Sequence, residues 1–417
     1  MSPIIKNDSK VTQRISLSEP VFAGNEWKYV KDCLDSRWVS SGKYVDLFEE
    51  RIAEYLRIPF AVSTANGTSA LHTALLVAGV QPGDRVVVPT LTFIATVNPV
   101  IYCGGIPVFV DVEEQTLNMD PAKALETVQG LVKQKKRPKA VIVTHLYGHP
   151  CDLDPILEIA REHGMTVIED ACESLGSKYK GKMTGTLGDI GCLSFNGNKI
   201  ITTGGGGMLV TNNSHYARKA RYLTTQARDH QIEYIHKETG YNYRMSNLQA
   251  ALGVAQLEQF EGFLQKKRMI AEHYQEHLKG IPGAQILYPQ PWAESNFWLN
   301  TLLLRNNGLA IDKDSLLEQL RGQGIEARPI FSPVHLQDCF HRYQKKNLPI
   351  AESCSGLNLP SSVDITQEEL IGVTEALKSI VQSQCSKMIL GEASRDPGNR
   401  ESKIREPRTK VQKALLE

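Results

Sequence analysis

Short hydrophobic runs and longer amphipathic patterns alternate along the chain from about residue 60 to residue 212. The runs have the length and β-branched character of buried strands. In chain order they read AVSTAN, RVVVP, PVFVD, AVIVTH, TVIED, CLSF and GMLVTN. Helical patterns lie between them, such as TSALHTALLVAGV, closed by Gly79, and LDPILEIAREHG, closed by Gly164. This repetition predicts an α/β domain whose mostly parallel sheet has helices on both faces, with ligands bound beyond the carboxyl ends of the strands.

The pattern changes after about residue 250. The segment LGVAQLEQFEGFLQKKRMIAEHYQEHL predicts one long amphipathic helix, and shorter strands and helices follow it. We therefore expect a flexible N-terminus over residues 1–14, a large α/β domain over 15–255 and a smaller α+β domain over 256–383. Residues 384–417 are charged and contain two prolines, which predicts a disordered or weakly helical tail.

Composition and charge narrow the classes of function. Of the 417 residues, 41% are hydrophobic and 22% are charged, and 47 basic side chains nearly balance 46 acidic ones. This balance argues against binding of nucleic acid or of an anionic membrane through bulk charge. No apolar run approaches the roughly 18 residues of a membrane span. The eight cysteines are scattered without a C-x-x-C pair, which indicates reduced thiols and a cytoplasmic protein.

Several common ligand motifs are not met. In SFNGNKIITTGGGGMLV, Lys199 precedes the glycines, whereas a P-loop needs a glycine directly before its lysine and a hydroxyl after it. The glycines lead into a strand, whereas those of a dinucleotide-binding G-x-G-x-x-G motif lead into a helix. His145, His149 and Cys151 lie around a turn rather than on one helix face, so a loop is favoured over a metal site. We predict no metal.

Asp170 and Lys199 occupy the positions that a catalytic pair would have in such a sheet. Asp170 ends the run TVIED, and Lys199 lies in the loop after CLSF, so parallel strands would direct both into one cleft. An ion pair alone would also satisfy this spacing. Residues 66–69, NGTS, offer a helix N-terminus to a phosphate, Ser194 offers a hydroxyl and Phe93 a ring face. Pyridoxal 5′-phosphate needs a lysine, a carboxylate, a phosphate site and a ring face together.

Five longer segments resemble the DegT/DnrJ/EryC1/StrS family. They read GNEWKYVKDCLDSRWVSSGKYVDLFEERIAEY, ANGTSALHTALL, VPTLTFIATVNPV, VIEDACESLGSKYKGKMTGTLGDIGCLSFNGNKIITTGGGGMLVTN and GYNYRMSNLQAALGVAQLEQ. The resemblance covers about residues 15–383. It implies the aspartate aminotransferase (type I) fold and an aminotransferase, dependent on pyridoxal phosphate, that acts on nucleotide-linked sugars. The branch with SFNGNKIITTGGGGM makes 4-amino sugars for legionaminic acid-type or bacillosamine-type pathways.

The resemblance also implies a reaction. An amino group would pass from an amino acid, expected to be L-glutamate, to the 4-keto group of a UDP- or GDP-linked 6-deoxy sugar. The product would serve the synthesis of surface polysaccharide or glycan precursors. Two alternatives remain open: a dehydratase of the same superfamily that works with pyridoxamine phosphate, and a ligand sensor without catalytic activity. Those dehydratases replace the lysine by histidine, and Lys199 is present.

Cofactor-binding residues are implied position by position. Lys199 matches the Schiff-base lysine, and Asp170 matches the partner of the pyridine nitrogen. Glu173 matches a position beside the cofactor hydroxyl, where the family varies among His, Gln and Glu. The remaining matches are Gly67, Thr68 and Ser194 for the phosphate cup and Phe93 for the stacking ring.

Further positions concern the substrate and a second subunit. Asn242 in GYNYR matches a residue that reaches the cofactor phosphate of the neighbouring subunit, which implies a homodimer with shared active sites. Six residues are candidates for contact with the sugar nucleotide, and a structural role is an open alternative for each. They are Trp38, Ser40, Ser41, Arg244, Arg328 and His335.

Overall fold

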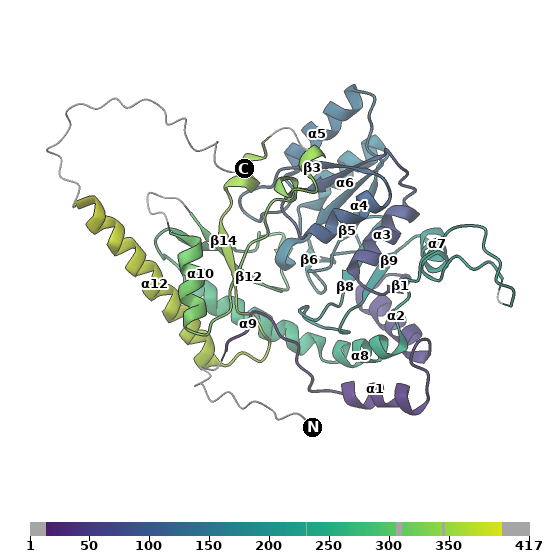
Figure 1. Ribbon diagram of the computed structural model, residues 1–417, viewed down its shortest axis with the longest axis horizontal. Coiled ribbons are helices and arrows are strands. Elements are labelled where there is room, and N and C mark those ends of the chain that lie inside the picture. Colours follow the sequence, from purple (N-terminus) through teal and green to yellow (C-terminus); the bar gives the residue numbers. More distant parts are fainter. Residues whose placement is uncertain (1–13, 231, 306–310, 344–346, 394–417) are drawn as a thin grey trace, which may run out of the picture.

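The computed structural model describes residues 14–393 apart from residues 231, 306–310 and 344–346 (Figure 1). Of the N-terminus expected to be flexible, only Arg14 falls within the described residues.

A seven-stranded sheet forms the centre of the larger part of the molecule, in the order β1-β9-β8-β5-β4-β2-β3. Its strands are β1 (Phe60–Thr64), β2 (Arg85–Pro89), β3 (Ile106–Val110), β4 (Ala140–Thr144), β5 (Thr166–Asp170), β8 (Ile190–Ser194) and β9 (Gly207–Thr211). β9 runs antiparallel to its neighbours β1 and β8, and the other neighbouring pairs are parallel. The predicted mostly parallel sheet is confirmed, and each hydrophobic run forms one of its strands.

Helices cover both faces of this sheet. Successive residues of a strand point to opposite faces, so Val86 and Val88 of β2 join one hydrophobic cluster and Val87 joins another. The first cluster includes residues of α3 (Gly67–Val77), α4 (Asn98–Tyr102) and α7 (Ser214–Thr224). The second includes residues of α5 (Pro121–Lys133) and α6 (Leu153–His163). Gly164 ends α6 in the left-handed conformation, with a φ of 58°, as the sequence predicts.

The segment predicted as one long helix forms two, α8 (Asn247–Leu257) and α9 (Phe260–His277). The prediction of a single helix is wrong because side chains at the break bind α1 (Glu26–Asp35). Gln259 Nε2 donates to Glu26 Oε1 over 2.7 Å, and Glu258 Oε1 accepts from the Tyr29 hydroxyl over 2.8 Å. These contacts join residues far apart in the chain, so helical periodicity does not reveal them.

A second sheet lies in the C-terminal part of the chain. Its order is β10-β12-β14-β13, with strands β10 (Ala284–Ile286), β12 (Asn300–Leu304), β14 (Gly356–Leu359) and β13 (Arg328–Pro329). It shares a hydrophobic cluster with α9, α10 (Lys313–Gly322) and α12 (Gln367–Ala393). α12 continues as a helix past residue 383, where the expected tail begins, and residues 394–417 of that tail lie outside the described residues.

The remaining elements include one further core helix and several short segments. The helix is α2 (Lys43–Leu56), whose Phe48 and Ile52 are fully buried, and the short segments include α11 (Pro349–Ser353) and a small sheet of β11 (Ala293–Glu294), β6 (Lys178–Tyr179) and β7 (Lys182–Met183). Figure 1 shows α1, α2 and α8 together at one end of the molecule and α5 at the other. Across the described part of the chain, no helix combines the length and apolar character that crossing a membrane requires.

Candidate active site

A cavity of about 630 Å³ lies where the carboxyl ends of β5 and β8 face the edge of the second sheet. Asp170 ends β5 and Ser194 ends β8, while Arg328 and Asn358 reach the cavity from β13 and β14. The position agrees with the rule that ligands bind beyond the carboxyl ends of parallel strands. Predicted residues among its lining are Gly67, Thr68, Phe93, Asp170, Glu173, Ser194, Lys199 and Arg328.

The Asp170 carboxylate is fixed at both of its oxygens. Its side chain is 5% exposed. Oδ2 accepts a hydrogen bond of 2.6 Å from the Thr96 hydroxyl, and Oδ1 accepts one of 3.2 Å from the Cys172 backbone N–H. Hydrogen bonds to both oxygens hold a carboxylate in one orientation. The Asp170 carboxyl group is therefore preorganised at the wall of the cavity.

Lys199 lies in the loop after β8 and faces two different partners. Its Nζ is 3.5 Å from Glu173 Oε1 and 3.7 Å from the centroid of the Trp298 ring. The side chain of Lys199 is 14% exposed. Asp170 and Lys199 line the same cavity, but the ion pair of Lys199 is with Glu173. The amine thus stands beside an open space rather than against Asp170.

Glu173 is a buried carboxyl group. Burial raises its pKa, and the nearby Lys199 charge and the Tyr147 backbone N–H oppose that rise. The Tyr147 N–H donates to Glu173 Oε2 over 2.8 Å. Glu173 thus places a buried carboxyl group in the cavity wall, with Oε2 held by the Tyr147 N–H and Oε1 facing Lys199.

The N-terminus of α3 forms a shallow cradle in the cavity wall. The Asn66 side chain accepts from the Ser69 N–H over 2.8 Å, while Gly67 and Thr68 line the cavity. A Cβ atom on Gly67 would lie 2.9 Å from both Cys172 Sγ and Ser194 Cβ, so only glycine leaves this space open. The first amides of a helix lack partners within the helix and attract anions. The cradle fits a phosphate group.

Two aromatic side chains stand on another wall of the cavity. Phe93 follows β2 and is 54% exposed, and its ring centroid lies 5.6 Å from that of Phe331. Both residues line the cavity. An accessible ring in this position fits an aromatic ligand.

Some predicted residues lie away from the cavity in this chain. Trp38, Ser40 and Ser41 follow α1 at the surface, and Asn242 and Arg244 are also exposed. None of these five is among the residues that line the cavity.

His335 also lies away from the cavity, and its surroundings indicate a structural role. The side chain is buried, with Nδ1 at 2.5 Å from Thr90 Oγ1 and Nε2 at 3.0 Å from Glu352 Oε1. Both ring nitrogens are therefore occupied within the chain, which leaves neither for a substrate. Arg328 does reach the cavity, where it pairs with Glu326 at 2.8 Å.

The histidines around the turn after β4 have partners within the protein. His145 Nε2 lies 3.0 Å from Glu169 Oε2, and its Nδ1 accepts from the Cys151 N–H over 3.0 Å. His149 Nε2 accepts from the Gln290 N–H over 3.1 Å. Within the part of the chain that the structure describes, no group of three or more His, Cys, Asp or Glu residues is placed to hold a metal ion.

Sequence reasoning missed four residues of the site. Thr96, Cys172, Trp298 and Phe331 all line the cavity. Thr96 follows Thr92 at a spacing of one helical turn after β2, and this repeat of hydroxyls beside Phe93 was a usable signal. Trp298 and Phe331 come from the C-terminal part of the chain, and no local pattern links them to Lys199.

Comparison with known proteins identifies the family. The DegT/DnrJ/EryC1/StrS aminotransferase family matches residues 21–378. The chain belongs to this family. It is 42% identical to GDP-perosamine synthase of Caulobacter vibrioides over 373 residues, which are 88% of this chain and 98% of that protein. It is 40% identical over 372 residues to a putative pyridoxal phosphate-dependent aminotransferase, EpsN, of Bacillus subtilis, which covers 88% of this chain and 95% of that protein.

A solved structure gives the same result for the fold of this family member. The crystal structure of the aminotransferase TlmJ from Streptoalloteichus hindustanus matches with a TM-score of 0.82 at 28% identity, over 88% of this chain and 99% of that one. The chain is an aminotransferase with the type I fold, and the cofactor of its family is pyridoxal phosphate. The cavity fits that cofactor, because a glycine cradle, a fixed carboxylate, a lysine and an accessible ring line one space.

Proposed function

We propose that this aminotransferase moves an amino group from L-glutamate to the 4-keto group of a UDP- or GDP-linked 6-deoxy sugar. The product would be a 4-amino sugar for surface polysaccharide or glycan precursors. One observation carries the proposal: Lys199, Asp170 and the N-terminus of α3 share one cavity of about 630 Å³, which also extends to the second sheet. Relatives named GDP-perosamine synthase, at 42% and 41% identity, support a nucleotide-linked sugar and favour GDP.

Each candidate residue has a role that follows from its position. We propose that Gly67, Thr68 and Ser194 hold the cofactor phosphate and that Phe93 stacks on its ring. The Asp170 carboxylate would accept a hydrogen bond from the ring N–H, and Thr96 fixes its direction. When bound, pyridoxal phosphate supplies an electrophilic carbon and an electron-withdrawing ring.

Lys199 Nζ would carry the proton in the reaction. It would take the proton from the α-carbon of the amino acid as a general base and return it as a general acid. The Trp298 ring, 3.7 Å away, supports the protonated amine through a cation–π contact. The Glu173 carboxyl group, which lines the same cavity, would form a hydrogen bond with the cofactor hydroxyl.

The proposal includes a homodimer with shared active sites. Asn242 and Arg244 are exposed and lie outside the cavity of their own chain, which is the position expected of residues that serve a neighbouring subunit. Both residues come after α7 in the chain. Between α7 and these residues, a segment projects from the body of the molecule (Figure 1).

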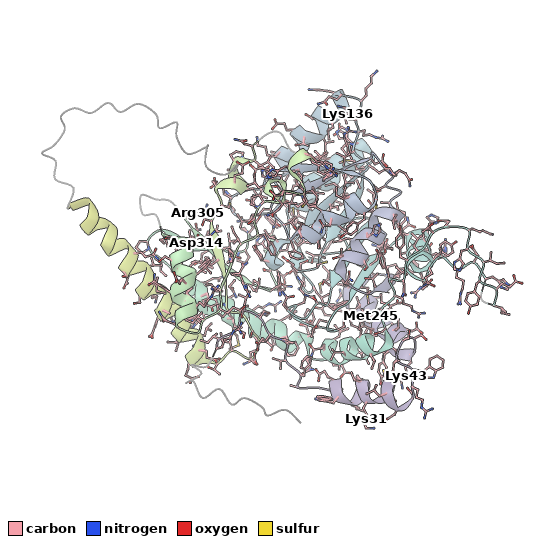
Figure 2. The ribbon with its side chains drawn as sticks, viewed as in Figure 1. Lys31, Lys43, Lys136, Met245, Arg305 and Asp314 are labelled. Carbon is pink, nitrogen blue, oxygen red and sulfur yellow. The ribbon has the colours of Figure 1, made fainter. Side chains whose placement is uncertain are left out.

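The end of the molecule near α1 offers a surface for the second copy. Large apolar side chains are exposed there: Trp27 at 83%, Leu34, Trp38 at 63% and Val39. Lys31 and Lys43, labelled at this end in Figure 2, pair with Asp35 and Asp32 at 2.6 and 2.7 Å. Because these charges are paired within the chain, the apolar side chains favour burial against another copy.

The cytoplasm remains our proposal for the location. The cysteines that the structure describes are free rather than disulfide-bonded, and most of them are buried. A reducing compartment suits such a protein.

Spectroscopy of the purified protein tests the proposed function. L-Glutamate should remove the absorbance band of the cofactor bonded to its lysine as the cofactor takes up the amino group, and a nucleotide-linked 4-keto sugar should then restore that band. Parallel assays with a UDP-linked and a GDP-linked keto sugar identify the nucleotide. An unchanged spectrum with every amino acid donor would favour the ligand sensor. Loss of a hydroxyl from the sugar, without gain of nitrogen in its mass, would favour the dehydratase.

A further inference from the structure

Tyr147 has a backbone conformation that a bulky residue seldom adopts. It follows β4, and its φ and ψ are 53° and 19°, in the left-handed region. The side chain is buried. Holding a non-glycine residue there costs of order 1 kcal/mol or more, and such strain collects at functional sites. Tyr147 takes no part in the proposed proton transfer by Lys199, so its backbone strain requires another explanation.

The two ends of Tyr147 bind opposite walls of the cavity. Its backbone N–H donates to Glu173 Oε2 over 2.8 Å, on the side of the seven-stranded sheet. Its hydroxyl oxygen accepts from the Phe331 N–H over 2.8 Å, directly after β13 of the second sheet. A single residue thus connects the carboxyl group beside Lys199 with the wall that carries Phe331.

The ring of Tyr147 fills the space between these ends. Its centroid lies 5.1 Å from that of Phe331 and 6.5 Å from that of Trp298, to which it is nearly parallel at 30°. Trp298 is the ring that faces Lys199. The ring therefore packs behind two aromatic residues that line the cavity.

The neighbouring residue allows this packing. Gly148 has a φ of 95°, and a Cβ atom there would collide with Asn296 Oδ1. That oxygen accepts from the Trp298 N–H over 2.9 Å, and Asn296 Nδ2 donates to the Glu173 carbonyl over 3.0 Å. Asn296 provides a second link between Glu173 and Trp298, so the strained turn sits within a bonded network.

We propose that Tyr147 is a positioning residue that sets the distance between the two walls of the cavity and thereby the fit of the keto sugar. The strained backbone aims the phenol across the gap, and the hydroxyl holds the wall at Phe331 in place. Tyr147 contacts Glu173, Phe331 and Trp298 rather than Lys199 or Asp170, so it acts on the space for the substrate rather than on proton transfer. The inference rests on the proposed function for its substrate.

The substitution Tyr147→Phe tests the inference. It keeps the ring and the bond to Glu173 but leaves the Phe331 N–H without its acceptor. We expect the KM for the nucleotide-linked keto sugar to rise about tenfold, the range expected when a partly buried N–H loses its acceptor. We expect kcat to stay within about twofold and the absorbance of the bound cofactor to stay unchanged, because Lys199 and Asp170 are untouched.

Tyr179→Phe is the matched control. Tyr179 is also fully buried, and its hydroxyl oxygen also accepts from a backbone N–H, that of Asp154, over 3.1 Å. It lies on β6 and does not line the cavity. Its loss should lower stability and leave the KM unchanged. An unchanged KM in Tyr147→Phe, or an equal rise in both variants, would overturn the inference.

Amide hydrogen exchange gives a measurement that needs no sugar. In the wild-type protein with cofactor bound, the Phe331 amide should be protected, and in Tyr147→Phe it should exchange about tenfold faster. If that variant did not fold, the wild type would still decide, since an unprotected Phe331 amide would overturn the inference. Absence of turnover with every keto sugar would instead overturn the proposed function and leave the exchange result standing.

Discussion

Lys199 illustrates how single side chains define this site. Its amine has a carboxyl group on one side and an indole face on the other, at 3.5 and 3.7 Å. Asp170, the other predicted catalytic residue, is held by different partners. The two groups therefore line one cavity with separate partners in the protein, as the proposed cofactor site between them requires.

The hydrogen bond from Thr96 to Asp170 should contribute to the rate. Thr96→Val removes the hydroxyl that fixes Oδ2 but keeps the shape of the side chain. We expect kcat to fall about tenfold, because a hydrogen bond to a charged group is worth roughly 1.5–3 kcal/mol. Thr374→Val is the control, since this buried threonine bonds carbonyls of its own helix, α12, and lies 3.4 Å from His273 Nε2, and it does not line the cavity. Equal kcat values for wild type and Thr96→Val would contradict this role.

Glu173 should give stability a distinct dependence on pH. Burial raises its pKa in the folded protein above the ordinary value of 4.5, so the folded state binds the proton more tightly than the unfolded state. Ionisation of the buried Glu173 therefore lowers the stability of the folded protein. This loss is absent below pH 4.5, grows between pH 4.5 and the raised pKa, and is complete above the raised pKa.

Glu173→Gln removes this titration. Thermal unfolding across the pH range should show the variant gaining stability relative to wild type as pH rises above 4.5. The exposed Glu54→Gln should show no such trend. A difference between Glu173→Gln and wild type that does not vary with pH would exclude the predicted titration.

Among single residues, those at or just after the end of a strand could be predicted from the sequence, and those brought to the site from distant parts of the chain could not. Asp170, Ser194 and Phe93 follow buried β-branched runs, so their places beside one cavity could be predicted. Trp298 and Tyr147 could not, because their contacts join segments far apart in the chain. The roles of the predicted site residues remain predictions.

At the scale of elements, the N-terminus of α3 is the proposed site for the phosphate of the cofactor. The turn from β1 into α3 brings Gly67 so close to Cys172 and Ser194 that a methyl group would fill the cradle. The approach depends on α3 and on the carboxyl ends of β5 and β8, which meet beside one another.

Gly67→Ala should therefore weaken cofactor binding. Its Cβ would crowd Cys172 Sγ and Ser194 Cβ at 2.9 Å, and we expect the affinity for pyridoxal phosphate to fall at least about tenfold. Gly130→Ala on α5 is the control, because no atom lies within 4 Å of its added Cβ. It should leave affinity unchanged and stabilise the helix by up to about 1 kcal/mol. Equal affinities in a fluorescence titration of the two variants would contradict the cradle.

Elements could be predicted where burial determines them. The seven strands of the main sheet are visible as hydrophobic runs because both faces of the sheet are covered. The break between α8 and α9 is hidden, because neither glycine nor proline marks it and contacts with α1 hold it.

At the scale of the whole molecule, residues of both sheets line the cavity. We propose that a second copy of the chain completes the site with its Asn242. The seven-stranded sheet supplies Lys199 and Asp170 through its loops and strand ends, whereas β13 and β14 supply the opposite wall. Asn242 lies outside this cavity.

Mixed dimers test whether sites are shared. Lys199→Ala and Asn242→Ala should each be inactive or weak alone. Dissociated and reassembled together in equal amounts, they should recover about one quarter of wild-type activity, because half of the dimers are mixed and each holds one intact site. In the control, the Lys199→Ala variant is mixed with a double variant that carries both Lys199→Ala and Asn242→Ala. This mixture should recover no activity, because no site contains Lys199. No recovery in the first mixture would contradict a site shared through Asn242.

Borohydride reduction followed by peptide mass mapping tests the central claim most directly. Reduction fixes the bond between pyridoxal phosphate and its lysine, so the modified residue can be read from the fragment masses. We predict that the added mass lies on Lys199 and that prior treatment with L-glutamate prevents it. Modification of a different lysine, or none at all in protein loaded with cofactor, would contradict the claim that Lys199 carries the reaction.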